Sequence, residues 1–507
     1  MSGAGKSTLL QVLAGLLAAD RGECVVTGRV GYVPQVDALH PELPVRAELR
    51  FAARLRCPGL DGAAIERRIG EVLAELGIAA LRDRVIATLS AGERKRVSVA
   101  IELLGDPDLL LLDEATAGID PRHEVGLLRH LRRLADSGCA VVLATHSTLA
   151  LGEFDRLLLL GRAGRQLYFG PPEQALRLAG AGTYVELFER DDVIAGTAVA
   201  VTDGAPGTDA ARVPGRSAPG GRTLGGRALG PLVRREFVRL VRERRRLLLL
   251  ALQAPLLGLL VRAMAGPDGL GLGALSLNLT ARRVVLTLVL SALWLGATNA
   301  VLEIVKDRAV ISRERVAGIR PAGRLVAKAL VLAAVGGVQA VVLVAVGVAG
   351  SPPPVAPAAG GPWWLVLVVT LWACGFATAC VALALSAWAN RGEVALAVLP
   401  LVLVPQLVLS GGVMAMQDAP ALRAVSYVAT ARWGMSAVAS AVDLRGIETS
   451  TVVPIPLDHQ ALSVVRHQDA DRYWNADAAT WWTDLGVLAA LAAAFLVLAA
   501  WGVRRRD

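Results

Sequence analysis

The sequence contains few cysteines and few aromatic residues for its length. The five cysteines among 507 residues have no metal-ligand spacing and imply no disulfide framework. Aromatic residues make up 4% of the chain, and no basic stripe is interleaved with them, so the net charge of +9 does not indicate a nucleic-acid-binding surface. No signal-peptide pattern follows Met1, because the first apolar run is short and comes after a lysine–serine turn.

Charged residues are distributed unevenly, and their distribution divides the chain. Hydrophobic residues make up 54% of the sequence and the mean hydropathy is +0.51, which is too apolar for an ordinary soluble protein. Up to about residue 190, charged and apolar residues alternate as in a soluble domain. From about residue 246, long uncharged runs approach the roughly 20 residues that cross a bilayer. We therefore predict a soluble domain followed by a membrane domain.

The first stretch, MSGAGKSTLL, has the pattern of a phosphate-binding loop. Residues 2–8 fit the last seven positions of G-x-x-x-x-G-K-[ST], and an apolar-faced helix is expected to follow. A helix beginning at Gly5 would direct free N–H groups and its dipole toward an anion. Lys6 would reach the β- and γ-phosphates, and the Ser7 hydroxyl would bind Mg²⁺. The alternative interpretation is an ordinary glycine-rich helix start.

Three short apolar segments are expected to form strands that end in polar residues. They are residues 29–35, 109–120 and 139–147. Fully apolar strands indicate burial on both faces, as in a parallel α/β sheet. Asp113 and Glu114 lie at the end of the second strand. One of these carboxylates could bind Mg²⁺ and the other could orient a water molecule. Taken singly, Gln35 is normally a solvated residue and His146 is more often structural.

Residues 89–107 predict a helix with a defined start and end. Ser90 and Glu93 have the S-x-x-E spacing of a capping box. Gly105 and Pro107 would end the helix. On its own, this is a common, well-capped helix.

The order of these segments resembles the nucleotide-binding domain of ATP-binding-cassette (ABC) proteins. The resemblance covers roughly residues 1–190 and implies an α/β P-loop ATPase domain that lacks its first strands. Residues 5–8 match Walker A, Gln35 matches the Q-loop and residues 90–93 match the signature loop. Residues 113–114 match Walker B, residues 118–120 match the D-loop and His146 matches the switch histidine.

The resemblance implies roles for these residues. Glu114 would polarise the attacking water, His146 would contact the γ-phosphate, and Gln35 would complete the catalytic set. The residues expected to hold ATP are Gly3, Ala4, Gly5, Lys6, Ser7, Thr8, Ser90, Gly92, Glu93 and Asp120. Those expected to hold Mg²⁺ are Ser7, Gln35 and Asp113. Ser90 and Gly92 would act in trans on ATP bound to a partner subunit, so a dimer would be obligatory.

The sequence departs from the family pattern in three places. Ala91 replaces the first signature glycine and would crowd a loop that approaches phosphate closely, so slower hydrolysis is expected. Ala115 replaces a proline that often follows Walker B. The family also places two strands and an adenine-stacking aromatic residue before the phosphate loop, and without them the sheet would keep an open edge. We interpret Met1 as a start inside a longer reading frame; the alternative is a truncated, non-functional protein.

The second half is predicted to be a six-span membrane domain over residues 231–507, joined through a flexible Gly/Ala/Pro linker at residues 191–230. Residues 232–247 predict a basic amphipathic helix lying on the inner leaflet. The expected spans are residues 247–265, 284–305, 325–349, 363–388, 394–416 and 484–503.

Basic residues predict the orientation of these spans. With six spans, residues 244–246, 306–320, 391 and 504–506 fall on one side together with the N-terminal domain, which would be cytoplasmic. Arg262, Arg282 and Arg283 depart from this rule. The segment from about residue 417 to 484 is then expected to be a large external loop.

The layout adds a finer resemblance, to the G subfamily of ABC transporters and their bacterial ABC-2-type relatives. It rests on GERKRVSVAIELL, on ALWLGATNAVLEIVKDRAVISRERVAGI and on one ATPase domain preceding one six-span domain. It implies ATP- and Mg²⁺-dependent export of an amphipathic, lipid-like or cell-envelope substrate by a dimer of half-transporters in the cell membrane. Its partners would be a second half-transporter and membrane lipid, not nucleic acid.

In that subfamily the helix after the second span rests on the ATPase. The candidate residues here are Glu303, Lys306, Asp307, Arg313, Glu314 and Arg315. Two other functions stay open. One is a truncated membrane protein that neither binds ATP well nor transports, and the other is an ATPase that signals instead of transporting.

Overall fold

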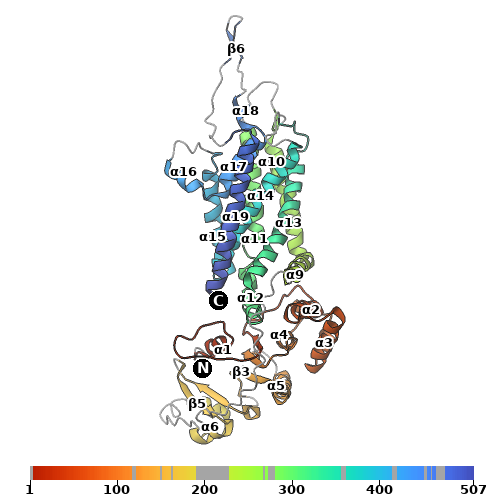
Figure 1. The fold of residues 1–507 in the computed structure, drawn as a ribbon, viewed down its shortest axis with the longest axis vertical. Coiled ribbons are helices and arrows are strands. Elements are labelled where there is room, and N and C mark those ends of the chain that lie inside the picture. Colours follow the sequence, from red (N-terminus) through yellow and green to blue (C-terminus); the bar gives the residue numbers. More distant parts are fainter. Residues whose placement is uncertain are drawn as a thin grey trace. The chain divides into compact units, whose positions relative to one another are not determined.

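The computed structural model describes residues 4–116, 121–148, 151–161, 164–189, 228–265, 269–271, 280–354, 361–413, 420–449, 454–457, 460–463 and 474–506. They form two compact units (Figure 1). Unit one comprises Met1–Arg235 and Asp307–Gly323, and unit two comprises Glu236–Lys306 and Arg324–Arg506. Nearly all of the predicted linker lies outside the described residues.

A three-stranded parallel sheet lies at the centre of unit one. Its strands are, in spatial order, β1 (Val30–Val33), β2 (Leu109–Asp113) and β3 (Ala140–Ala144). The three segments predicted to be strands therefore form strands. Their parallel pairing, with crossovers between them, confirms the α/β class.

Strand β3 is less buried than its apolar sequence predicts. β2 has a neighbour on each side, whereas β3 pairs only with β2 among the described strands. A cavity of about 680 Å³ is lined on one side by β3 and on another by β4 (Leu157–Leu160). Val142 at the middle of β3 is 39% exposed. The prediction of complete burial is wrong for β3, because no described strand covers its outer edge.

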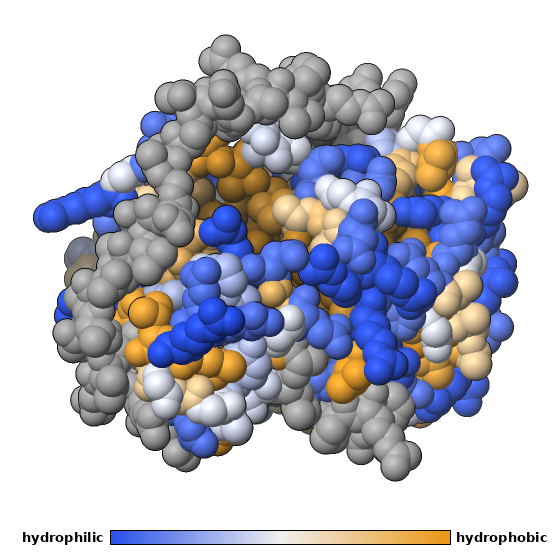
Figure 2. Space-filling model, turned by 90° about the horizontal axis from the view of Figure 1, so that it is seen from below, coloured by the Kyte–Doolittle hydropathy of each residue, from blue (hydrophilic) through white to orange (hydrophobic). Residues whose placement is uncertain are grey.

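Helices surround this sheet and form the core of unit one. They are α1 (Lys6–Leu13), α2 (Val45–Arg56), α3 (Gly62–Glu75), α4 (Ala91–Leu103), α5 (Pro121–Asp136), α6 (Pro172–Ala179) and α7 (Tyr184–Glu189), with 3-10 turns at Ala79–Leu81, Ile86–Thr88 and Leu151–Glu153. Leu49, Ile69 and Ile101, from α2, α3 and α4, are fully buried in one cluster. β4 pairs antiparallel with β5 (Gln166–Gly170). The face seen in Figure 2 is mostly hydrophilic, as expected for a soluble domain.

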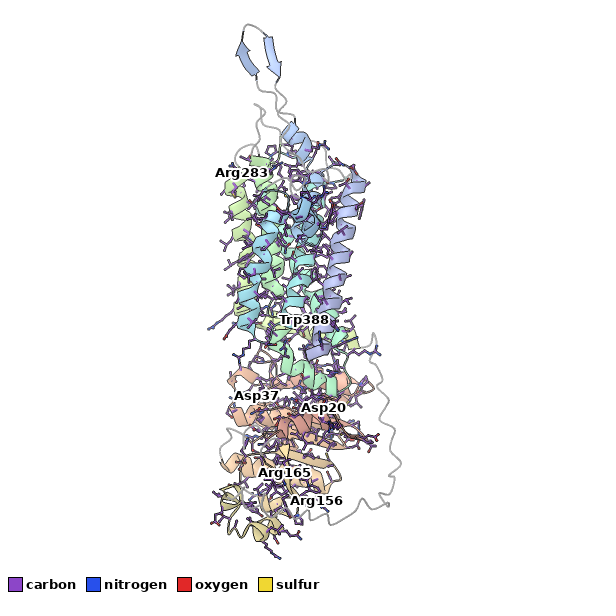
Figure 3. The ribbon with its side chains drawn as sticks, turned by 90° about the vertical axis from the view of Figure 1, so that its left-hand side faces the viewer. Asp20, Asp37, Arg156, Arg165, Arg283 and Trp388 are labelled. Atoms are coloured by element: carbon purple, nitrogen blue, oxygen red, sulfur yellow. The ribbon has the colours of Figure 1, made fainter. Side chains whose placement is uncertain are left out.

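Among the residues that the structure describes, six helices of the second half are long and apolar enough to cross a membrane. They are α10 (Arg244–Ala265), α11 (Thr280–Ala300), α13 (Pro321–Gly347), α14 (Trp363–Trp388), α15 (Gly392–Leu409) and α19 (Ala478–Arg506). Each overlaps a predicted span, so the six-helix membrane domain is confirmed. Figure 3 places Arg283 of α11 and Trp388 of α14 at opposite ends of this bundle.

Small residues allow two of these helices to approach closely. A Cβ atom placed on Gly296 of α11 would lie 1.9 Å from the carbonyl oxygen of Gly375 in α14. No side chain fits at that distance. The contact is typical of membrane helices, where small residues let backbones meet.

The predicted basic helix is divided in the structure. α9 (Leu229–Arg242) ends before Glu243, and α10 begins at Arg244. Residues 244–247 therefore belong to the first membrane helix and not to an amphipathic helix that precedes it. Glu243 is the only residue that separates the two helices.

The segment after α15 is more than an external loop. It contains α16 (Pro420–Ser426), α17 (Thr430–Ala441), α18 (Leu444–Thr449), β6 (Pro454–Leu457) and β7 (Gln460–Ser463). Every residue of α17 is buried, and Met435 and Val438 belong to the core of unit two. The prediction of a loop is wrong for α17, most of whose side chains are small or apolar and which packs against α11, α14 and α19.

Candidate functional site

The start of α1 has the conformation of an anion-binding helix end. Gly5 is the N-cap residue, with φ 83° and ψ 10°, a left-handed conformation that favours glycine. The predicted helix start at Gly5 is therefore confirmed. The first N–H groups of a helix have no partner within the helix and carry the positive end of its dipole.

Ser7 in the first turn of α1 reaches the end of strand β2. Its hydroxyl donates a hydrogen bond to Asp113 Oδ1 at 3.0 Å. Asp113 is buried, and this burial raises the pKa of its carboxyl. The hydrogen bond from Ser7 lowers that pKa and the charge of Glu114 raises it. A buried carboxylate beside a hydroxyl offers the hard oxygen donors that Mg²⁺ uses together with phosphate oxygens.

Glu114 is held between the ends of the two neighbouring strands. Gln35 Nε2, just after β1, donates to Glu114 Oε2 at 2.6 Å. His146 Nε2, just after β3, lies 2.8 Å from Glu114 Oε1. Glu114 itself has φ 48°, an uncommon conformation for a residue other than glycine. Both oxygens of the carboxylate are thus fixed by side chains that the sequence analysis singled out.

Most of the predicted site residues are described by the structure. Ser7, Gln35, Asp113, Glu114 and His146 come together in one cluster. Ala4, Gly5, Lys6 and Thr8 belong to the same loop and helix start, whereas Gly3 and Asp120 lie outside the described residues. The positions agree with the predicted roles, but the roles themselves stay predictions.

The predicted signature residues lie at the start of α4. Ser90 Oγ accepts a hydrogen bond from the Glu93 N–H at 3.2 Å, and the Ser90 N–H donates to Glu93 Oε2 at 2.8 Å. The predicted capping box is therefore confirmed. Gly92 lies between them in the first turn.

Sequence reasoning missed Lys95, in the second turn of α4. Only 6% of it is exposed, and its ammonium group donates to the Gln35 carbonyl at 2.5 Å. The only signal was the basic run of residues 94–96, which is normally a solvated face.

Helix α12 (Arg308–Val316) packs within unit one, as the prediction of a helix resting on the ATPase domain requires. The Arg313 guanidinium donates to the Ala38 carbonyl and lies 3.5 Å from Glu48 Oε1. Glu314 accepts hydrogen bonds from Arg235. Burial lowers the pKa of Arg313, while Glu48 and other acids raise it.

Two other predicted residues of this helix region belong to unit two. Glu303 Oε2 lies 2.8 Å from Lys328 Nζ, and Glu303 Oε1 lies 3.0 Å from Lys306 Nζ. Both ion pairs therefore lie within unit two.

Two families match successive parts of the chain. The family "ABC transporter" matches residues 1–117, and the family "ABC-2 type transporter" matches residues 227–442. These matches cover the site described above and most of the membrane helices.

Three relatives show the same resemblance. The "ABC transporter ATP-binding/permease protein Rv1747" of Mycobacterium tuberculosis is 31% identical over 525 aligned positions, which include 99% of this chain and 59% of that protein. The "ABC transporter G family member 21" and "member 17" of Dictyostelium discoideum are 37% and 38% identical, each over 33% of this chain and 13% of the relative. This chain therefore spans about three fifths of its mycobacterial relative. The chain therefore joins a domain that matches the ABC transporter family to a membrane domain that matches the ABC-2 type transporter family.

Proposed function

We propose that the protein hydrolyses ATP to export an amphipathic, lipid-like or cell-envelope substrate, and that it works as a dimer of half-transporters. The observation that carries this proposal is the cluster of Ser7, Asp113, Gln35, Glu114 and His146. The described part of the same chain also has six helices that are long and apolar enough to cross a membrane. Phosphoryl transfer to water requires a helix end that binds phosphate, an acidic residue that binds the metal ion and a second acidic residue that orients the water molecule.

Each group of the cluster has a distinct task in this proposal. The N–H groups at the start of α1 and the Lys6 ammonium bind phosphate oxygens. Ser7, Asp113 and Gln35 would hold Mg²⁺, which neutralises phosphate charge when bound. Glu114 orients the attacking water and accepts its proton. His146 fixes Glu114 and approaches the γ-phosphate.

The dimer completes the nucleotide site. Ser90, Gly92 and Glu93 present a second helix N-terminus, on α4, which is suited to bind phosphate. We propose that this end of α4 closes over ATP bound to the partner subunit, with Asp120 nearby. A half-transporter would then hydrolyse ATP only as a dimer.

The protein would span the cell membrane with its ATP-binding domain in the cytoplasm. The support is the basic residues that flank the spans on one side, at residues 244–246, 306–320, 391 and 504–506.

The domain over residues 1–190 would be completed by one more strand. β3 offers an unpaired edge among the described strands, and an apolar cavity of about 680 Å³ lies beside it. Edges of this kind are normally covered. We propose that a segment preceding the phosphate loop fills the cavity. Peptides from upstream of Met1 in the native protein would support this, whereas a mature N-terminus at Met1 or Ser2 would contradict it.

Reconstitution tests the transport function. The purified protein in vesicles should move fluorescently labelled phosphatidylethanolamine between leaflets when ATP and Mg²⁺ are added. Lys6→Ala should abolish the movement, because the phosphate loop loses its cation. ATP hydrolysis without movement of any lipid probe would favour the signalling ATPase, and absence of nucleotide binding would favour the inactive protein.

A further inference from the structure

Helix α4 contacts two different parts of the site along its length. Its N-cap residue Ser90 and its first-turn residue Gly92 face ATP of the partner subunit under the proposed function. Its second turn carries Lys95, whose side chain reaches the loop after β1 in its own chain. That loop contains Gln35 and also Asp37, which is labelled in Figure 3.

The Lys95 ammonium group makes three contacts with this loop. Its ammonium donates to the carbonyl of Gln35 at 2.5 Å and to that of Pro34 at 3.1 Å, and it lies 3.5 Å from Asp37 Oδ1. An ammonium group has three N–H donors and no acceptor. The two carbonyl contacts therefore hold the backbone on both sides of the Gln35 side chain, and the third contact holds the Asp37 carboxylate.

Arg94 provides a second contact from the same turn. Its Nε donates to Asp37 Oδ2 at 2.7 Å, and its Nη1 donates to the Leu89 carbonyl at 2.7 Å. Asp37 thus accepts from two successive residues of α4. The helix and the Gln35 loop are joined by charged hydrogen bonds, which are stronger than neutral ones.

Lys95 also lies in the electrostatic field of the acids at the site. Burial lowers the pKa of Lys95, while Asp37, Asp113 and Glu114 raise it. Removal of a buried cation leaves the groups that it contacts without their partner, which is destabilising. The contacts of Lys95 with the loop carbonyls and with Asp37 are therefore expected to hold the loop in place. Gln35 in turn holds Glu114 at 2.6 Å.

We propose that Lys95 is a positioning residue that links the two nucleotide sites of the dimer. This inference rests on the proposed function, because it requires the start of α4 to close on ATP of the partner. When the first turn of α4 binds that ATP, the second turn moves the Gln35 loop of its own chain. Gln35 then aligns Glu114 in the site of that chain, so that ATP at one site activates the other.

A Lys95→Met variant tests the link, because methionine keeps the length of the side chain and removes the cation. We expect wild-type ATPase activity to rise cooperatively with ATP concentration, with a Hill coefficient above 1. In Lys95→Met the Hill coefficient should fall to about 1 and kcat should fall about tenfold. The affinity of the protein for ATP should change less than about twofold, since the phosphate loop is intact.

Arg67→Met is the matched control, because it removes an exposed cation from α3 of the same unit. It should keep the wild-type Hill coefficient and kcat. Asp37→Asn is the second variant, for use if Lys95→Met does not fold, and it should reduce cooperativity in the same direction but less. A folded Lys95→Met or Asp37→Asn protein with wild-type cooperativity would overturn the proposal, and so would a non-cooperative wild type.

The two proposals fail in different ways. ATP-dependent dimerisation of Glu114→Gln, and of the Glu114→Gln/Lys95→Met double variant, is measured by size-exclusion chromatography with light scattering. If Glu114→Gln does not dimerise, the proposed function fails. If it dimerises but the double variant does not, Lys95 supports the fold or the interface and the proposed link fails. Dimerisation of both, together with lost cooperativity, supports the link.

Discussion

The two units bring their polar side chains together in different ways. In unit one, Asp113 ends strand β2 and Gln35 and His146 lie just after the two neighbouring strands, so the parallel sheet brings the three together at one edge. In unit two, the buried polar pairs join different helices. Asn299 donates to Gln339 at 2.6 Å, and Thr378 lies 2.8 Å from Thr430.

This difference indicates in which kind of fold a functional site can be predicted from the sequence. At the edge of a sheet, a short local pattern fixes both the type of side chain and its direction, so a phosphate loop and two acids are recognisable. In a helical bundle, the partners come from distant segments and no local pattern marks them. Unit one therefore supports specific predictions about chemistry, whereas unit two supports predictions about packing.

The largest expected effect is on catalysis in unit one. Glu114→Gln keeps the size of the side chain but removes the base, so turnover should fall about 10²- to 10⁴-fold. ATP should still bind, and the variant should accumulate as an ATP-bound dimer. ATPase assays and light scattering measure the two quantities.

Glu75→Gln is the control for this prediction, because Glu75 is an exposed acid at the end of α3. It should hydrolyse ATP at the wild-type rate. Full activity of Glu114→Gln would reject the assignment of the base and weaken the contrast between the two units.

The sequence predicted the site of unit one better than its surroundings. The strands, the helix start at Gly5 and the capping box at Ser90 depend on neighbouring residues, and all of them are confirmed. The burial of β3 was predicted wrongly, because burial depends on which strand lies beside it. Lys95 was missed, because a basic run on a helix looks the same in sequence whether it is solvated or buried.

Unit two shows the same limit. The six spans were predicted from length and composition, because a helix that crosses the bilayer must be long and apolar. α17 was missed, because its 12 residues are too short for a span and its burial depends on packing between α11, α14 and α19. The break between α9 and α10 was missed, because basic residues continue across it.

The second prediction concerns the charges that join α12 to unit one. Arg313 is 2% exposed and lies beside Glu48 and Glu102. Arg313→Met would leave those acids without their guanidinium, and breaking a buried ion pair costs about 3–5 kcal/mol. Denaturant unfolding of the protein should show this loss in free energy of unfolding.

Arg320→Met serves as its control, because Arg320 is exposed just after α12. It should unfold like the wild type. Equal unfolding curves for the two variants would mean that the contacts of Arg313 contribute little to the stability of unit one.

The third prediction tests packing in unit two. In Gly296→Ala the new methyl group would meet the Gly375 carbonyl, so α11 and α14 must separate. Overpacking of this kind costs about 1–3 kcal/mol. The melting temperature in detergent should fall. Gly486→Ala in α19 meets nothing within 4 Å and should melt like the wild type. If both variants melt alike, the close approach of the two helices is not needed.

The smallest expected effect is a pH dependence of metal binding in unit one. Burial raises the pKa of Asp113, and a proton on its carboxyl competes with Mg²⁺. Affinity for Mg²⁺ should therefore be full above the raised pKa and should weaken as pH falls through it, at a pH above the roughly 3.9 of a free aspartate. Calorimetric titrations in buffers of different ionisation enthalpy should show proton release on binding at the lower pH. Asp83→Asn, which removes an exposed acid, should keep this profile. Asp113→Asn should lose it, and if Asp113→Asn keeps the profile, another group carries the proton.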